Sequence, residues 1–323
     1  MSFYQLDAKA PGSKLIYIDT RDVVSSGGQF MATDAQGDPL TSFFKFNLKT
    51  PMEVSNSHQI LLSLHSCSIP YSFYNIRDEV NNYVDMTVTP TGGTASAVVL
   101  ELEAGNYSAS SLKDHLIDKF VAANTGLTLT VTYDKVNMKY SFSCVGGTLT
   151  IDGATGNTKH KACAAELGLR GDFGVTAVPS KAPFVADLYG SVHGLFIRTD
   201  LMQRNVLDSN TNSFGNILAR VPIKVQSGGV IFHEPNNSTH KCLIKQRAVD
   251  ELVIRITDER NRLLDFNGLH LNLAIQLDFL LDKGKVNGDH IVRRPHLAAP
   301  AEVAKRTKTK PRKRHKKKSK DKS

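Results

Sequence analysis

The sequence lacks the short motifs that mark the most common classes of enzyme. It contains no GxGxxG after a strand, no GxxxxGK[ST], no GxSxG and no HExxH. Such motifs place a phosphate-binding loop, a nucleophile or a zinc ion, so their absence removes the usual sequence support for these chemistries. We therefore expect a protein that is not an enzyme, with no catalytic residue and no cofactor.

Long apolar runs and paired cysteines are also missing. No apolar run reaches the ~20 residues that a membrane-spanning helix needs, so no such segment is expected. The first residues lack the features of a signal peptide, which predicts a start in the cytosol. The four cysteines, Cys67, Cys144, Cys163 and Cys242, include no CxxC pair. Without a secretory signal we expect them to be reduced, with buried thiols.

The basic charge of the chain is confined to its C-terminal end. The formal net charge is +9, from 40 Lys and Arg against 31 Asp and Glu. Residues 305–323 contain twelve Lys or Arg and one Asp, so they carry +11 and the rest of the chain sums to −2. A wide basic face for nucleic acid on the rest of the chain is therefore not expected, whereas the tail could bind a polyanion.

The tail at 305–323 has no apolar periodicity, which predicts a disordered segment after a linker at 284–304. A flexible polycation neutralises phosphates by counterion release, with no sequence preference and strong dependence on salt. The same run also fits a nuclear localisation pattern, and the two uses are compatible. The predicted nucleic-acid-binding residues are Lys305, Arg306, Lys308, Lys310, Arg312, Lys313, Arg314, Lys316, Lys317, Lys318, Lys320 and Lys322.

Alternating apolar and polar residues predict many short strands. In the clearest case, every other residue from Leu269 to Phe279 is apolar, which predicts a strand over 269–280. Residues 42–48 and 59–69 show further alternation. Many short strands with frequent turn signals favour an antiparallel sandwich, Greek key or jelly roll over a parallel α/β fold.

A small α+β insertion is predicted at 104–170. Leu112, Leu116 and Phe120 repeat at helical spacing, and Ser108 or Ser110 can act as the N-cap. Two alternating strands joined by a turn-sized linker then predict a hairpin over 127–144.

Two groups of side chains could form a site, but each has a simpler interpretation. His233, His240 and Cys242 flank a polar loop, but their spacing is irregular for zinc and no fourth ligand is evident, so no metal site is predicted. Glu101 and Glu103 would lie on one face of a strand, as the two carboxylates of a glycosidase might. A solvated outer face explains them better.

Six blocks between residues 14 and 280 carry a resemblance to a known family. They are LLSLHSCSIPYSFYNI at 61–76, LEAGNYSASSLKDHL at 102–116, ELGL at 166–169, FIRTDL at 196–201, NILARVPI at 216–223 and LVIRITDERNRLLDFNGLHLNLAIQLDF at 252–279. Together they resemble the penton and minor capsid proteins of the double-jelly-roll dsDNA virus lineage. That lineage includes nucleocytoplasmic large DNA viruses, virophages, and Polinton-like and adintovirus elements.

The resemblance implies an all-β, antiparallel single jelly roll formed by residues 1–103 and 171–283, with 104–170 as an inserted subdomain. It further implies a structural virion protein, with five copies at each icosahedral vertex in contact with the major capsid protein. Another minor capsid position is the open alternative within the family. The location would be the capsid, with assembly in the host cytoplasm or nucleus, and the tail would face the packaged DNA.

Two other functions remain open on the sequence. A virion core or chromatin-like protein would bind nucleic acid through its body, which the net charge of −2 outside the tail argues against. A carbohydrate-binding attachment protein would use the polar loop at 233–240 for recognition.

Overall fold

A computed structural model gives the structure of the chain. It describes residues 12–281, except residues 35, 56–57, 154–160, 190–191, 202–205, 236–239 and 245. The predicted linker and tail at 284–323 lie outside the described residues. In the part described, no helix is long and apolar enough to cross a membrane.

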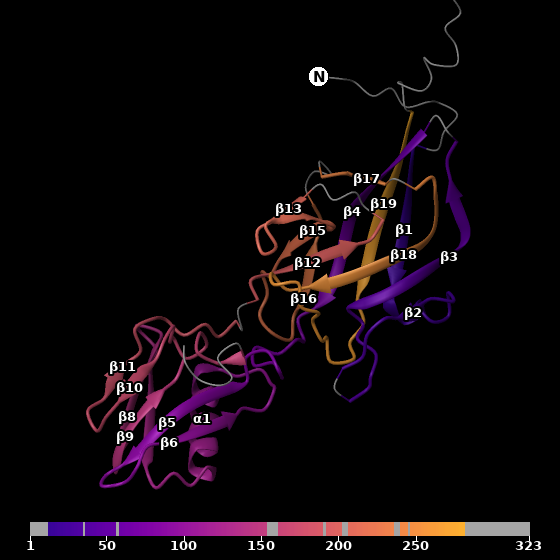
Figure 1. Ribbon diagram of the computed structural model, residues 1–323. Coiled ribbons are helices and arrows are strands. Elements are labelled where there is room, and N and C mark those ends of the chain that lie inside the picture. The colour runs from indigo at the N-terminus through magenta and orange to yellow at the C-terminus, as the bar shows by residue number, and fades with distance from the viewer. Residues whose placement is uncertain are drawn as a thin grey trace, which may run out of the picture. The chain divides into compact units, whose positions relative to one another are not determined.

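Two antiparallel sheets form a sandwich (Figure 1). Their strands are β1 (Ser13–Asp19), β2 (Gln29–Phe30), β3 (Phe43–Glu53), β4 (His58–Pro70), β12 (Gly194–Thr199), β15 (Ile217–Pro222), β16 (Val230–His233), β17 (Cys242–Ile244), β18 (Ala248–Thr257) and β19 (Asn272–Leu281). The first sheet has the order β1-β19-β4-β16, and β17 also pairs with β4. The second sheet has the order β15-β12-β18-β3-β2.

This strand order is that of a jelly roll. With β16 and β17 counted as one strand and β2 left aside, the strands in chain order form the sheets 1-8-3-6 and 5-4-7-2. The first strand pairs with the last, the second with the seventh, and so on inward, as in one long hairpin rolled into a sandwich. The structure therefore confirms the predicted all-β, antiparallel jelly-roll fold.

Alternation along the strands builds the core between the two sheets. In β19, Leu273, Ile275, Leu277 and Phe279 are all buried. The predicted strand over 269–280 begins too early, because β19 starts at Asn272. Leu269 is 50% exposed and follows a turn at Gly268, whose φ of +73° does not belong to a strand. The apolar alternation thus continues through the turn at Gly268, so the alternation alone does not reveal where the strand begins.

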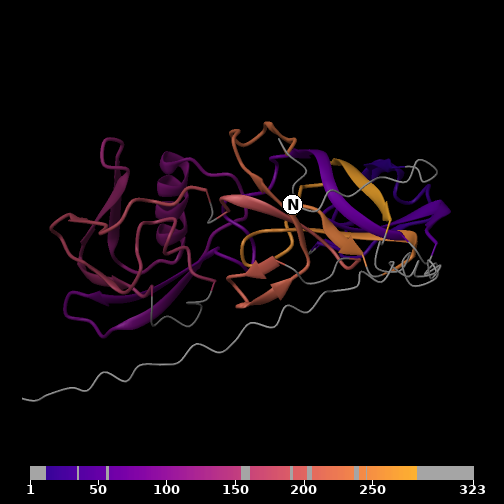
Figure 2. The ribbon, with the colours of Figure 1, turned by 90° about the horizontal axis from the view of Figure 1, so that it is seen from above.

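A folded insertion interrupts the jelly roll between β4 and β12. It contains the helix α1 (Ala109–Ala122) and the strands β5 (Tyr83–Pro90), β6 (Ser96–Glu101), β7 (Thr128–Asp134), β8 (Lys139–Val145), β9 (Gly147–Ile151), β10 (Phe173–Val175) and β11 (Ser180–Lys181). The strands form two sheets, β10-β9-β5-β6 and β11-β8-β7. Figure 2 shows α1 against the strands of the insertion.

The predicted helix and hairpin of the insertion are confirmed. Leu112, Leu116 and Phe120 form the buried face of α1. Ser108 is the N-cap: its side chain accepts from the backbone N–H of Ser111, whose own side chain accepts in return from the backbone of Ser108. Such reciprocal bonds satisfy backbone donors that a helix start leaves unpaired. Strands β7 and β8 pair in register along their whole length.

The insertion has a hydrophobic core of its own, which is wider than the expected range of 104–170. Its buried cluster runs from Ile76 to Ala182 and includes Met86 of β5 and Leu100 of β6. Strand β5 joins this cluster because it pairs with β9, more than fifty residues away. Short alternating strands look alike in the sequence whichever core they serve, so this partnership was not predictable from the pattern.

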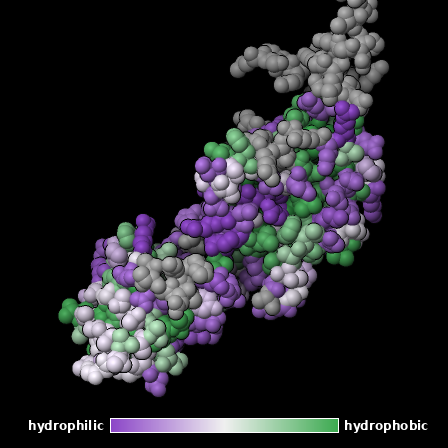
Figure 3. All heavy atoms as spheres, viewed as in Figure 1, coloured by the Kyte–Doolittle hydropathy of each residue, from purple (hydrophilic) through white to green (hydrophobic). Residues whose placement is uncertain are grey.

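All four cysteines are buried, as predicted. Cys67 and Cys242 belong to the sandwich core, and Cys144 and Cys163 to the core of the insertion. Burial raises the pKa of the Cys67 thiol to about 12, so this thiol stays protonated and unreactive near neutral pH. On the surface, apolar residues form separate groups between hydrophilic ones on the face shown in Figure 3.

Candidate functional site

The predicted nucleic-acid-binding residues lie outside the described part of the chain. All twelve, from Lys305 to Lys322, belong to the segment after residue 281. Their role therefore stays a prediction from charge. The described residues offer a different candidate site, at the place where the jelly roll meets the insertion.

The structure does not gather the three weighed metal ligands around one point. His233 of β16 lies opposite Cys67 of β4, whereas Cys242 of β17 lies opposite Leu62 of the same strand. Five residues along a strand correspond to about 16 Å, which is far beyond the reach of one zinc ion. Only His240 and Cys242 approach each other, with Nε2 and Sγ 3.5 Å apart. Within the described ranges, no three His, Cys, Asp or Glu side chains form a metal-binding group.

Glu101 and Glu103 are both exposed, in accordance with the solvated-face interpretation. The Nζ of Lys119 lies 3.0 Å from Glu103 Oε1. This hydrogen bond lowers the pKa of Glu103, with the charge of Lys119 acting in the same direction. A glycosidase acid needs the opposite shift, because it must hold a proton at neutral pH.

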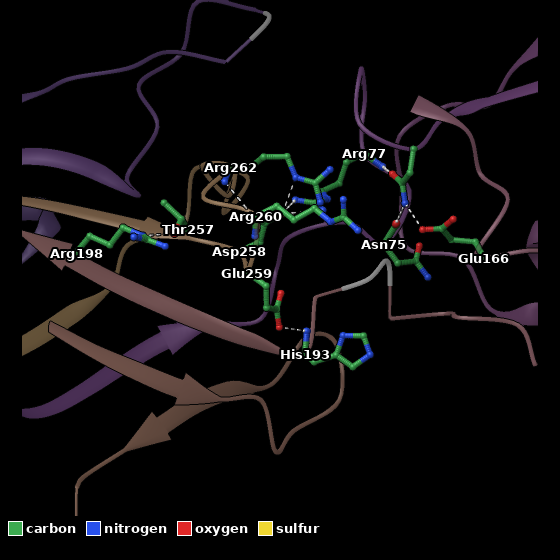
Figure 4. Close-up of polar contacts among 11 residues, drawn as sticks. Asn75, Arg77, Glu166, His193, Arg198, Thr257, Asp258, Glu259, Arg260 and Arg262 are labelled. Atoms are coloured by element: carbon green, nitrogen blue, oxygen red, sulfur yellow. Dashed lines mark hydrogen bonds and ion pairs between the residues drawn. The ribbon is translucent and has the colours of Figure 1, made fainter. Parts of the chain in front are cut away.

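A largely buried polar network, here called the polar junction, joins the sandwich to the insertion (Figure 4). Within it, His193 is exposed, and Glu259 and Arg262 are half-buried. The outgoing chain enters the insertion after β4, and the returning chain re-enters the sandwich at β12. The turn after β18 lies beside both. The members of the polar junction are Asn75, Arg77, Asn81, Glu166, His193, Asp258, Glu259 and Arg262.

Asp258 is the centre of the polar junction and is fully buried. Its Oδ2 accepts from Arg77 Nη2 at 3.2 Å and from Arg262 Nε at 2.7 Å. Its Oδ1 accepts the backbone N–H groups of Arg260 and Arg262, each at 2.9 Å. One carboxylate therefore orders its own turn and neutralises a guanidinium that reaches it from the outgoing chain.

The neighbouring residue binds the returning chain. Glu259 Oε1 accepts the backbone N–H of His193 at 2.8 Å, directly before β12. Asn75 links the two crossings from the other side, because its Nδ2 donates to the carbonyl oxygens of Tyr107 at 2.8 Å and Leu188 at 2.9 Å. Its Oδ1 accepts the backbone N–H of Tyr107 at 2.9 Å. The outgoing and returning chains are thus tied both to the sandwich and to each other.

Glu166 extends the polar junction into the insertion. Asn81 Nδ2 donates to Glu166 Oε1 at 2.6 Å and to the carbonyl oxygen of Asn75 at 2.8 Å. Burial raises the pKa of Glu166 to about 7, with a smaller upward contribution from Asp187 against the lowering effects of Asn81 and Arg77. Burial also lowers the pKa of Arg77, an effect that the charge of Asp258 opposes.

The polar junction connects the sandwich core with the core of the insertion. Among its members, no nucleophile is paired with a base. Each of its charged groups makes at least one hydrogen bond within the protein, which suits a fixed joint. Arg77 Nε, Glu166 Oε2 and Glu259 Oε2 are buried atoms that make none. No local pattern in the sequence predicts the partnership of Asp258 with Arg77, which is 181 residues away in the chain. The local signal for the turn itself is an Asp at the start of a turn that contains Arg260 and Arg262, a composition typical of a side chain capping its own turn.

The described residues thus define an antiparallel jelly-roll protein with a folded insertion that is held by the polar junction. No protein-family model matches the chain, and no curated protein matches it. Among solved structures, the chain is similar to the crystal structure of the selenomethionine-labelled mavirus penton protein. The similarity has a TM-score of 0.46 at 9% sequence identity, and it covers 83% of this chain and 100% of that one. The jelly-roll assignment rests on the strand order of this chain itself.

We expect Asp258→Asn to lower the free energy of unfolding by about 3–5 kcal/mol. The amide keeps an oxygen for the backbone N–H groups of the turn but leaves Arg77 buried without a counter-charge. Denaturant titration measures the loss. Glu103→Gln is the matched control, because it breaks an exposed pair with Lys119 and is expected to change little. Equal effects of the two substitutions would contradict the central role of Asp258.

Stability should also depend on the protonation of Glu166. The folded pKa of about 7 lies above the ordinary value of 4.5, so the folded state keeps a proton that the unfolded chain releases between these values. The stabilisation is therefore fully present below the unfolded value and is lost as pH rises through the folded one. Glu166→Gln imitates the neutral form at every pH.

The difference in thermal midpoint between the two proteins tests this dependence. Near the ordinary pKa of 4.5, the thermal midpoints of the unchanged protein and of Glu166→Gln should coincide. Above about pH 7.5, the Glu166→Gln protein should unfold at the higher temperature. Every other titrating group is common to both proteins, so the difference isolates Glu166. Parallel curves across this range are the result that refutes a buried, neutral Glu166.

Proposed function

We propose that the chain is a structural virion protein that forms the pentameric vertex, or penton, of an icosahedral DNA-virus capsid. The observation that carries the proposal is a jelly roll interrupted after its third strand by a separately folded insertion. Jelly rolls are recurrent building blocks of viral shells, although lectins and cupins also use them. The fold alone is therefore compatible with several functions. The residues of the polar junction provide further support for a role in a viral shell.

Three of the six sequence blocks that resemble the penton family contain members of the polar junction. The block at 61–76 ends at the Asn75 crossing, and the block at 252–279 contains Asp258 and Arg262. The short block at 166–169 begins with Glu166. Arg77, Asn81 and His193 lie outside the blocks, so the similarity includes five of the eight residues that fix the insertion to the sandwich. A vertex protein needs such a joint if the insertion is to present a defined surface.

The proposed partners follow from this function. Copies of the chain would contact each other around the vertex, and the major capsid protein would surround them. The basic residues at 305–323 would contact the packaged DNA. The location would then be the virion, after assembly in the host cytoplasm or nucleus.

The copy number tests the vertex role directly. We expect the purified protein at high concentration to form closed rings of five copies, measured by sedimentation and by image reconstruction. Closed rings arise from head-to-tail interfaces whose rotation closes. A protein that stays monomeric and is absent from purified particles would exclude the vertex role.

Removal of residues 305–323 should separate DNA binding from assembly. The truncated protein is expected to lose binding to duplex DNA and to form the same oligomers as the full chain. For the full chain, the logarithm of the binding constant should fall steeply and linearly with the logarithm of the salt concentration. A tail of the same composition in scrambled order is the control and should bind equally well. Tight binding by the truncated protein would instead assign nucleic-acid binding to the body.

A further inference from the structure

A small hairpin lies on the outer face of the second sheet of the sandwich. Its strands are β13 (Val206–Asp208) and β14 (Ser213–Gly215), and they pair only with each other. Asp208 anchors it, because Arg198 of β12 donates from Nη2 to Asp208 Oδ2 at 2.9 Å, and both side chains are buried. Arg198 Nε also donates to Thr257 Oγ1 at 3.1 Å. A buried ion pair thus fixes the hairpin in one position on the sheet.

The hairpin presents two large apolar side chains to solvent, here called the apolar knob. Leu207 and Phe214 are direct cross-strand partners and are 60% and 57% exposed. They alternate with the anchoring Asp208, so the ion pair that holds the hairpin also turns them outward. An exposed Leu–Phe pair on a hairpin held by a buried ion pair suits a binding surface.

A shallow groove of about 300 Å³ lies on the outer face of the first sheet. Tyr17 of β1 and Phe232 of β16 flank it and are 72% and 67% exposed. Small side chains line it between them, namely Ser66 and Ser68 of β4 and Ala274 of β19. These side chains share one face of the sheet, since Tyr17 lies opposite Ala274, Ala274 opposite Ser66, and Ser68 opposite Phe232. We call this surface the aromatic groove.

The knob and the groove lie on the outer faces of the two opposed sheets, so they cannot meet within one copy. Their charged surroundings are complementary. Asp19 and Asp22 line the groove, and because Asp19 is paired with Arg21, the negative charge of the groove rests on Asp22. On the outer face that carries the knob, Arg220 lies 6.0 Å from the ring centre of Phe196, and Arg255 lies 5.8 Å from that of Phe43.

We propose that the apolar knob of one copy docks in the aromatic groove of a second copy. The inference deepens the proposed function and rests on it, because it names the surfaces through which copies of a shell protein would associate. The two surfaces differ, so the contact is heterologous, and an open chain of copies retains one free knob and one free groove at its ends for further copies. Repetition of such a contact closes into a ring when its rotation permits.

Two double variants and their mixture test the contact. The knob variant carries Leu207→Ser and Phe214→Ser, and the groove variant carries Tyr17→Ser and Phe232→Ser. Each is expected to remain monomeric under conditions in which the unchanged chain associates. An equimolar mixture should give only a dimer, because one intact knob and one intact groove remain available. Sedimentation velocity distinguishes monomer, dimer and larger rings.

Matched controls separate this effect from general loss of apolar surface. Val121→Ser with Val136→Ser removes two side chains of the insertion that are 69% and 89% exposed, and should leave association unchanged. Thermal midpoints should stay close to that of the unchanged chain in all variants, because the replaced side chains are exposed. A knob or groove variant that still forms the full oligomer, or a mixture that stays monomeric, overturns the proposal.

Crosslinking adds a positive readout. Phe214→Cys on one copy and Phe232→Cys on another should form a disulfide between chains under oxidising conditions, since the four native thiols are buried. Five-copy rings that persist in both double variants would overturn the knob-and-groove contact and leave the vertex role standing. Association that depends on the knob in a protein absent from virus particles would support the contact and overturn the vertex role.

Discussion

The structure depends on the turn at 258–262. This turn holds the chain at the point where it leaves the sandwich for the insertion and at the point where it returns. Asp258 takes the Arg77 guanidinium of the outgoing chain, and Glu259 accepts the backbone N–H of His193 on the returning chain. Since Asp258 also orders the backbone of its own turn, the position of one carboxylate fixes the anchor for both. The contacts of Asn75 and Glu166 extend this anchor into the insertion.

The joint is polar although each of the two cores that it connects is apolar. The sandwich and the insertion bury separate hydrophobic clusters. A hydrophobic contact between them would stabilise many relative positions almost equally, because burial of apolar area has no direction. Buried ion pairs give little net stability but have strict geometry, since a shifted Arg77 guanidinium would be left buried without its counter-charge. The polar junction thus contributes less net stability than an apolar contact would, but it favours one orientation of the insertion.

The parts of the structure that sequence analysis predicts well are those that local pattern determines. The alternation in β19, the helix behind Ser108 and the β7–β8 hairpin all follow from residues close together in the chain. Leu269 marks the limit of this approach, because a turn at Gly268 interrupts a strand whose apolar alternation continues. The pairing of β5 with β9 and the ion pair between Arg77 and Asp258 join distant segments, and neither leaves a periodic signal.

The distribution of charge separates two physical tasks within the proposed function. Residues 305–323 carry +11, and the rest of the chain sums to −2. Nearly neutral bodies approach each other without long-range repulsion, so short-range apolar contacts decide how they associate. In the proposed function, binding of a polyanion to residues 305–323 would weaken with salt, whereas burial of the apolar knob would not depend on charge. If the same basic charge were spread over the sandwich, neighbouring copies would repel until nucleic acid neutralised them, and assembly would require the genome. Confining the charge to residues 305–323 would remove that coupling between assembly and nucleic acid.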